Sequence, residues 1–287
     1  MLITEAEALA FWRSALDPGG VGLREALAAE IADFRSEPIA AVLEHMSKGT
    51  DEFADLWRSA NIDVSDQSSV ERFYRDQFTE AYELANWHAG VTTGTPPLNY
   101  ARAALLARAR GWTRALDFGS GIGSGSLCFA TAGCEVHSAD IAVQLLTFVE
   151  YRMRRHRFTP SLINLSEGDR PRAGYYDVVT CFDVLEHVPN QLEKLRELSG
   201  YLRPGGYLFV NLMDDSIQAD RPMHISSAGE WLSLVRKTDL VPAWSLFGGE
   251  AQILQKQRLG RIRNVVGTLV DRWQGATGAG LRERTRS

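Results

Sequence analysis

A run of alternating glycines constrains this chain more than any other feature of its sequence. Residues Arg114–Phe118 read as a short strand, and Gly119, Gly121 and Gly123 follow it at every second position. Glycines at such a junction between a strand and a helix let the backbone turn tightly and let a ligand approach without a Cβ in the way. The run therefore predicts a ligand-binding turn at the carboxyl end of a strand.

The segments around this turn alternate between strand-like and helix-like patterns. Further strands are expected at 135–140, 161–165, 176–182, 206–211, 241–247 and 251–255. Helical stretches lie between several of them, notably at 191–201 and 227–237. Alternation of this kind indicates parallel strands joined by helices that cover both faces of a sheet. We therefore expect an α/β fold with a doubly wound, seven-stranded and mostly parallel sheet.

The amino-terminal third has a different pattern, because its apolar residues recur at spacings of three and four. We expect a helical extension over 1–95, the ligand-binding domain over 96–258, and a basic carboxyl-terminal helix or tail over 259–287. One helix of the extension is expected to begin at the capping box Ser68–Glu71. An aromatic stripe at Tyr74, Phe78 and Tyr82 follows it, and this stripe either packs on the neighbouring domain or walls a substrate pocket.

The composition limits the kinds of molecule that the chain is expected to bind. The 31 Lys and Arg residues against 36 Asp and Glu give a net charge of −5, so no basic field recruits nucleic acid, and none is expected as a partner. The 3 cysteines form no C-x-x-C pair, which argues against a zinc ribbon, and no metal is expected. We see neither a secretory signal nor an apolar run long enough to span a membrane, so we expect a cytoplasmic protein of undetermined oligomeric state.

Two details separate the glycine turn from a dinucleotide site. The G-x-G-x-x-G spacing would need glycine at position 124 or 126, where the chain has Ser124 and Ser126. In addition, Asp117 lies two residues before the first glycine, where its carboxylate would repel a pyrophosphate but hold a cationic ligand. A dehydrogenase is therefore the weakest of the enzyme classes considered.

The D-x-G-x-G-x-G pattern beginning at Asp117 resembles the first motif of class I S-adenosylmethionine-dependent methyltransferases. An acid at Asp140, the segment 176–189 and the turn 202–208 follow at the intervals of that family, so the resemblance covers roughly 85–256. Within the family, the chain looks like the type 11 and type 12 subgroup. The resemblance implies S-adenosyl-L-methionine as cofactor and a small-molecule substrate whose acceptor atom, O, N or C, stays open.

The resemblance also implies which residues hold the cofactor. Asp140 would accept the two ribose hydroxyls, and Ile141 would cover the adenine. The family often has an acid at the end of the third strand, where this chain offers Asn164, with Asp169 as a second choice. The full set implied for the cofactor is Asp117, Gly119, Ser120, Gly121, Gly123, Asp140, Ile141, Asn164, Leu165 and Asp183.

Histidines are the natural candidates for a catalytic base, since an unperturbed imidazole has a pKa of ~6.5. We assign His187, in a loop that borders the methyl donor in this fold, and His224, after the fifth strand. His88, at the junction of the extension and the core, is a further candidate, and each of the three could instead be a structural, hydrogen-bonded residue. A base is needed only for a hydroxyl, an acidic carbon or a protonated amine.

Other functions stay open on the sequence alone. The same chemistry could act on a peptide or protein, and a cofactor fold that has lost turnover could serve as a binding partner. The intact glycine turn and Asp140 argue against loss of cofactor binding, but they do not establish catalysis.

The ribose assignment gives the first prediction. Replacing Asp140 by alanine is expected to weaken binding of S-adenosylmethionine by about 1–3 kcal/mol, because two hydroxyls lose their acceptor. Titration calorimetry measures the affinity. NAD serves as the control ligand and is expected not to bind. Unchanged affinity in the variant would refute the assignment.

Overall fold

The sheet contains seven strands in the described part of the chain, which comprises residues 3–75, 77–211, 221–225, 231–246 and 251–257 of a computed structural model. The strand order is β3-β2-β1-β4-β5-β7-β6. The strands are β1 (Arg114–Phe118), β2 (Glu135–Asp140), β3 (Leu162–Asn164), β4 (Tyr176–Cys181), β5 (Leu202–Asn211), β6 (Leu240–Leu246) and β7 (Ala251–Lys256). The strands from β3 to β5 in this order pair in parallel, whereas β7 runs antiparallel to both of its neighbours. The predicted seven-stranded, mostly parallel sheet is confirmed.

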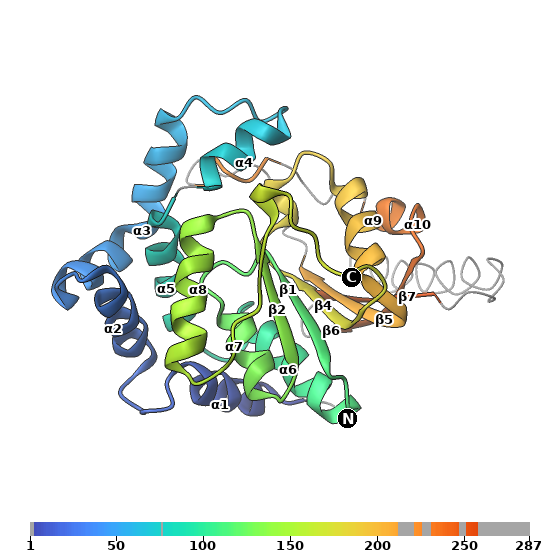
Figure 1. The fold of residues 1–287 in the computed structure, drawn as a ribbon, viewed down its shortest axis with the longest axis horizontal. Helices are drawn as coiled ribbons and strands as arrows, with labels where there is room; N and C mark the ends of the chain where they lie inside the picture. The colour runs from blue at the N-terminus through green and yellow to red at the C-terminus, as the bar shows by residue number, and fades with distance from the viewer. Residues whose placement is uncertain (1–2, 76, 212–220, 226–230, 247–250, 258–287) are drawn as a thin grey trace, which may run out of the picture. The chain divides into compact units, whose positions relative to one another are not determined.

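Helices cover both faces of this sheet (Figure 1). The helices are α1 (Glu5–Leu16), α2 (Leu23–Arg35), α3 (Ile39–Ser59), α4 (Gln67–Arg75), α5 (Thr79–Ala89), α6 (Leu98–Arg110), α7 (Ser124–Thr131), α8 (Val143–Arg155), α9 (Gln191–Tyr201) and α10 (Trp231–Arg236). On one face, Ala115 of β1 joins a core with α1, α6 and α7, and on the other Leu116 joins a core with α9 and α10. Successive strand residues point to opposite faces, so β1 is buried on both, as the predicted doubly wound fold requires.

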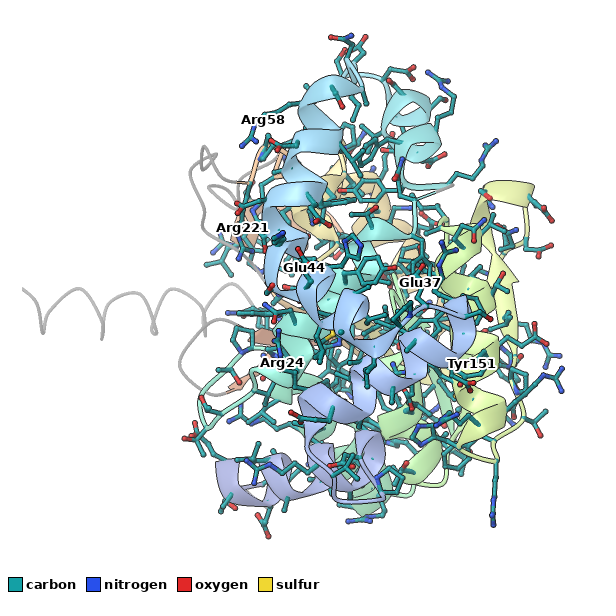
Figure 2. All side chains as sticks on the ribbon, turned by 90° about the vertical axis from the view of Figure 1, so that its left-hand side faces the viewer. Arg24, Glu37, Glu44, Arg58, Tyr151 and Arg221 are labelled. Carbon is teal, nitrogen blue, oxygen red and sulfur yellow. The ribbon has the colours of Figure 1, made fainter. Side chains whose placement is uncertain are left out.

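The helices of the amino-terminal extension share their apolar cores with the sheet domain. Trp12 of α1 packs in the same cluster as residues of β1 and β4, and Leu27 of α2 packs with Phe148 of α8. Figure 2 shows polar residues on this side of the molecule, where Arg24 of α2 donates to Asn86 of α5 at 2.5 Å and Tyr82 donates to Glu37 at 2.9 Å. Residues Met1–Lys256 form one compact unit. The domain boundary at residue 95 therefore stays a prediction from the sequence pattern.

The aromatic stripe lies on two helices, where the sequence indicated one. α4 ends at Arg75, and Phe78 precedes the first residue of α5. As a result, Tyr74 packs with Phe53 and Trp57, whereas Phe78 and Tyr82 pack in a separate cluster with α2, α3 and α8. The capping box at Ser68 also does not form: the helix begins one residue earlier, and the Asp66 carboxylate accepts from the Ser68 amide at 3.0 Å.

Strand β5 begins at Leu202, four residues before the predicted start, because the Pro-Gly-Gly turn belongs to the strand. The register between β4 and β5 shifts there, between Tyr176 and Val178. A Cβ on Gly206 would lie 2.9 Å from the carbonyl oxygen of Tyr176, so only glycine fits this close approach of the two strands.

Two predicted features fall partly or wholly outside the described residues. The basic helix or tail over 259–287 lies outside them, and so does the expected start of the helix at 227. Among the described helices, none combines the length and the apolar character needed to cross a membrane.

The shared core predicts that the extension stabilises the whole fold. Trp12 is 0% exposed, and its Nε1 donates to the carbonyl of His88 at 3.2 Å. Trp12→Ala is therefore expected to lower the free energy of unfolding by about 3–5 kcal/mol, as measured by urea denaturation. The control is Val64→Ala, whose side chain is exposed and should cost less than about 0.5 kcal/mol. Similar stability of the two variants would contradict a shared core.

Candidate active site

The glycine turn leaves β1 and enters α7 in a conformation that requires glycine. Gly119, Gly121 and Gly123 have φ of 70°, 51° and 74°, in the left-handed region that other residues avoid. A Cβ on Gly119 would also lie 2.2 Å from a methyl carbon of Val184, in the loop after β4. The alternate spacing in the sequence therefore reflects three left-handed residues that fold the loop against the end of the sheet.

The carboxylate of Asp140 fixes the backbone of this turn. Its Oδ2 accepts from the amide of Gly121 at 2.8 Å, and its Oδ1 accepts from the amide of Ala142 at 2.9 Å. Burial raises the pKa of the Asp140 carboxyl, and these backbone hydrogen bonds oppose the rise by favouring the charged form. Asp140 thus connects the end of β2 with the loop that follows β1.

Asp117 lies beneath the turn. It is 0% exposed and accepts from the hydroxyls of Ser126 at 2.8 Å and Thr180 at 3.0 Å. Burial raises its pKa to about 6, although both hydroxyl contacts favour the carboxylate. Asp117 is not among the residues that line the cavity next to the turn, and its assignment to the cofactor stays a prediction.

A cavity of about 900 Å³ opens beside the turn and gathers most of the residues assigned to the cofactor. The assigned residues that line it are Gly119, Ser120, Gly121, Asp140, Ile141, Leu165 and Asp183. The hydroxyl of Ser120 is buried there and has no hydrogen-bond partner among the described residues, as expected for a group that meets a ligand. We call this space the cofactor cavity.

Asn164 and Gly123 lie outside the lining of this cavity. The amide oxygen of Asn164 accepts from the backbone amide of Ser166 at 3.2 Å and from its hydroxyl at 2.7 Å. It therefore caps the short 3-10 helix Leu165–Glu167, which begins directly after β3. Gly123 is the residue that precedes α7. Their assignment to the cofactor stays a prediction.

A second cavity, of about 760 Å³, adjoins the first. The two share the side chains of Glu80, Leu84, Asp183 and His187 in their walls. Acidic groups dominate the second lining, and burial together with the charges of Asp140 and Glu83 holds the pKa of Glu80 well above its usual value. We call this space the acceptor cavity.

Both histidines assigned to catalysis line the acceptor cavity, with their ring centroids 5.0 Å apart. His187 Nδ1 lies 3.0 Å from the carbonyl oxygen of Met223 and 3.1 Å from the hydroxyl of Tyr74. Since a carbonyl can only accept, Nδ1 carries the proton, and Nε2 is left as the acceptor. Burial lowers the pKa of His187 to about 4, so the ring is neutral at pH 7.

Asp183 stands in the wall between the two cavities. Its φ of 54° is unusual for a residue other than glycine, and its amide donates to the side chain of Asn211 at 2.8 Å. Burial and the charge of Glu186 raise the pKa of Asp183 to about 7, with the Asn211 amide and Arg221 opposing the rise. A carboxyl group that titrates near neutrality, in a wall common to two cavities, is typical of a functional site.

One cluster of side chains has the composition of a metal site. Glu186, His187 and His224 each offer one ligand atom, and these atoms lie within 4.8 Å of one another. Carboxylate and imidazole groups suit several divalent metals, so these residues could hold one. The sequence reasoning expected no metal, and that expectation stays untested.

The sequence analysis missed several residues that line the cavities. Glu80 and Leu84 of α5 face both spaces, and Tyr100 of α6 and Val70 of α4 face the cofactor cavity. Of the aromatic stripe, Tyr74 lines the cofactor cavity, whereas the pocket-wall alternative named a substrate pocket. Nothing in the local sequence marks Glu80.

Comparisons with known proteins identify the family of this chain. A family of methyltransferase domains matches residues 94–250. A ubiquinone biosynthesis O-methyltransferase of Xanthomonas campestris pv. campestris is 31% identical over 164 residues, which cover 52% of this chain and 65% of that protein. A protein of the same description from Marinobacter nauticus is 30% identical over 142 residues, 44% of this chain and 59% of that one. The matched part therefore spans less than two thirds of either relative.

The fold has a solved counterpart as well. The structure of an O-methyltransferase family protein from Burkholderia thailandensis aligns with a TM-score of 0.51 at 15% identity, covering 77% of this chain and 72% of that one. This likeness concerns the fold alone. The match to the family extends over more than half of the chain and includes the glycine turn, Asp140 and the two histidines of the acceptor cavity. The chain belongs to the methyltransferase-domain family, as its resemblance to the class I S-adenosylmethionine-dependent methyltransferases predicts.

Proposed function

We propose that this chain transfers a methyl group from S-adenosyl-L-methionine to a small-molecule acceptor. The observation that carries the proposal is the pair of adjoining cavities, one built on the glycine turn and the other sharing Asp183 and His187 with it. Two ligands that occupy these spaces would meet at a common wall, as a donor and an acceptor must. The names of the curated relatives support a small-molecule acceptor.

The residues of the cofactor cavity fit a cationic nucleoside ligand. Asp140 offers the ribose a carboxylate that the backbone already orients, and Ser120 offers a buried hydroxyl without a partner. The carboxyl groups of Asp140 and Asp183, when ionised, favour a positive ligand over a pyrophosphate, which they would repel. These groups argue for the sulfonium cofactor and against NAD.

The bound cofactor would supply an activated methyl group whose leaving thioether needs no acid. The tasks of the chain are to align the two ligands and to exclude water, which together can account for a large part of a rate enhancement. Helices α3 and α5 contribute to this enclosure, because Phe53, Glu80, Glu83 and Leu84 line the acceptor cavity. The amino-terminal extension is thus part of the acceptor site.

A metabolite screen tests the proposed acceptor class. The purified protein is incubated with S-adenosylmethionine and a small-molecule extract, and products are sought by their mass gain of about 14 daltons for each methyl group. Transfer to small molecules supports the proposal. Transfer confined to peptides, or binding of the cofactor without any transfer, would contradict it and favour one of the alternative functions.

The titration of Asp183 gives a prediction about charge. Above its pKa of about 7 the group is ionised and attracts the sulfonium, and below it the group is neutral. Affinity for S-adenosylmethionine is therefore expected to rise severalfold between pH 6 and pH 8, as measured by calorimetry. S-adenosylhomocysteine, which has no sulfonium charge, serves as the control and should show a smaller rise.

The variant Asp183→Asn should reduce the pH dependence of the affinity for S-adenosylmethionine in this range. An undiminished pH dependence in the variant would assign the titration to another group. Equal pH dependence for the two ligands in the wild type would show that Asp183 does not sense the charge on sulfur.

The histidines give a prediction about proton transfer. If the acceptor loses a proton, His187→Ala or His224→Ala should lower turnover by ~10²–10⁴-fold with little change in cofactor affinity. Because the neutral ring is the base, activity that depends on His187 is present above its pKa of about 4 and is lost as the pH falls through that value. Turnover of both variants within a few-fold of wild type would show that alignment alone suffices.

A further inference from the structure

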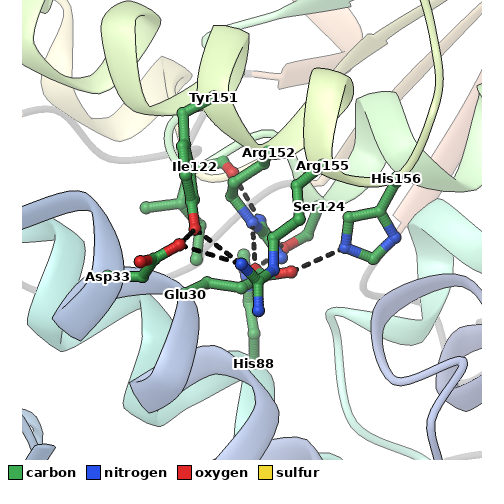
Figure 3. Close-up of polar contacts among 9 residues, drawn as sticks. All are labelled: Glu30, Asp33, His88, Ile122, Ser124, Tyr151, Arg152, Arg155 and His156. Carbon is green, nitrogen blue, oxygen red and sulfur yellow. Dashed lines mark hydrogen bonds and ion pairs between the residues drawn. The ribbon is translucent and has the colours of Figure 1, made fainter.

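A buried arginine connects the amino-terminal extension with the glycine turn. Arg152 of α8 is 0% exposed and donates through Nε to Glu30 of α2 at 2.6 Å. Its Nη1 donates to the carbonyl of Ile122, inside the turn, at 2.5 Å and to the hydroxyl of Ser124 at 3.3 Å. Figure 3 shows these contacts, together with His156, which binds the other oxygen of Glu30 at 2.6 Å.

The contacts continue from Ser124 to a histidine. The Ser124 hydroxyl lies 2.9 Å from Nδ1 of His88, and no other described residue forms a hydrogen bond with that ring. The serine oxygen accepts from Arg152, and its own hydrogen can then be donated to Nδ1. In that arrangement the neutral imidazole accepts at Nδ1 and carries its proton on Nε2, which is the opposite tautomer to that of His187.

His88 is held firmly and lines the cofactor cavity. Its ring is 5% exposed and stands edge-on to the rings of Trp12 and Tyr100, at centroid distances of 5.4 and 6.4 Å. Burial and the nearby charge of Arg152 lower the pKa of His88 to about 3, which leaves the ring neutral. A neutral imidazole has one N–H to give, and here that N–H belongs to the nitrogen that Ser124 does not use.

Two further residues with hydroxyl groups, Tyr100 and Ser120, line the same cavity, and both are buried. The Ser120 hydroxyl has no hydrogen-bond partner in the described part of the chain. Lys194 also lines the cavity, but its ammonium is already paired with Glu197 at 2.6 Å. The described lining contains no arginine, so the neutral donors of the lining are candidates to bind an anionic group there.

We propose that His88 donates a hydrogen bond to the carboxylate at the amino-acid end of the cofactor, and that Glu30, Arg152 and Ser124 position it by fixing its tautomer. The inference rests on the proposed function, because that cofactor carries one anionic group. His88 is the binding residue, with Tyr100 and Ser120 as neighbouring donors. Glu30 and Arg152 act through Ser124 and are positioning residues.

Two ligands that differ only at the amino-acid end test the assignment. S-adenosylhomocysteine carries the carboxylate, whereas 5′-methylthioadenosine lacks the whole amino-acid part. His88→Ala is expected to weaken binding of S-adenosylhomocysteine by about tenfold to a hundredfold, as for a hydrogen bond to a charged group, and to leave binding of 5′-methylthioadenosine within about threefold. His88→Gln keeps an N–H donor and should recover part of the loss.

The positioning residues require a separate readout. In Ser124→Ala and Glu30→Gln the ring of His88 should become a mixture of tautomers, which nitrogen NMR shifts of the imidazole report. Binding of S-adenosylhomocysteine should fall severalfold in both variants. The matched control is Asp33→Asn, which removes an exposed pair between the same two helices, with Arg155 at 2.9 Å, and does not reach Ser124 (Figure 3). The control should leave the tautomer and both affinities unchanged.

The outcomes separate this inference from the function on which it rests. If the wild type binds neither ligand, the proposed cofactor is wrong. If it binds both and His88→Ala weakens the two equally, His88 is a structural residue of the cavity and the carboxylate assignment fails. A wild-type ring with its proton on Nδ1, or a tautomer that Glu30→Gln leaves unchanged, would refute the positioning role.

Discussion

The site depends on one carboxylate that holds the glycine turn in place. Asp140 accepts from the amides of both Gly121 and Ala142, so the end of β2 fixes the loops after two neighbouring strands. The turn itself can follow this course only because its glycines adopt left-handed conformations. The backbone of the turn therefore sets the shape of the cofactor cavity, and side-chain contacts adjust that shape. In the proposed function the same carboxylate also meets the ribose.

Glu30 and Arg152 form a buried ion pair beside the turn. Burial alone raises the pKa of Glu30, but the charge of Arg152 and the hydrogen bond from His156 outweigh it, so the net shift is downward. Removing one partner from such a buried pair is costly, because the other charge is left without compensation. The pair thus links α2 to the turn, and the helical extension takes part in the geometry of the cofactor cavity as well as covering the acceptor cavity.

Local patterns were enough to predict the fold and the turn. Strands β1, β2 and β4 follow apolar runs that end in glycine or acid, and alternate glycines mark the turn unambiguously. The orientation of Glu80 could not be predicted, since it depends on how α5 packs against the sheet. Arg152 reads in the sequence as part of a cationic run, which usually faces water, yet tertiary packing buries it against Glu30. Asn164 shows the same limit of prediction from local sequence. Its place at a strand end suggested that it binds a ligand, and in the structure its amide oxygen caps the following 3-10 helix.

The most direct test of the account is a crystal structure of the protein with S-adenosylhomocysteine. We expect the ribose to bind Asp140. We expect the sulfur to lie at the wall between the two cavities, which contains Asp183 and His187. With this placement, a methyl group on the sulfur would face the second cavity. A ligand bound elsewhere, or one whose sulfur is turned away from that wall, would contradict the assignment of the two cavities to donor and acceptor.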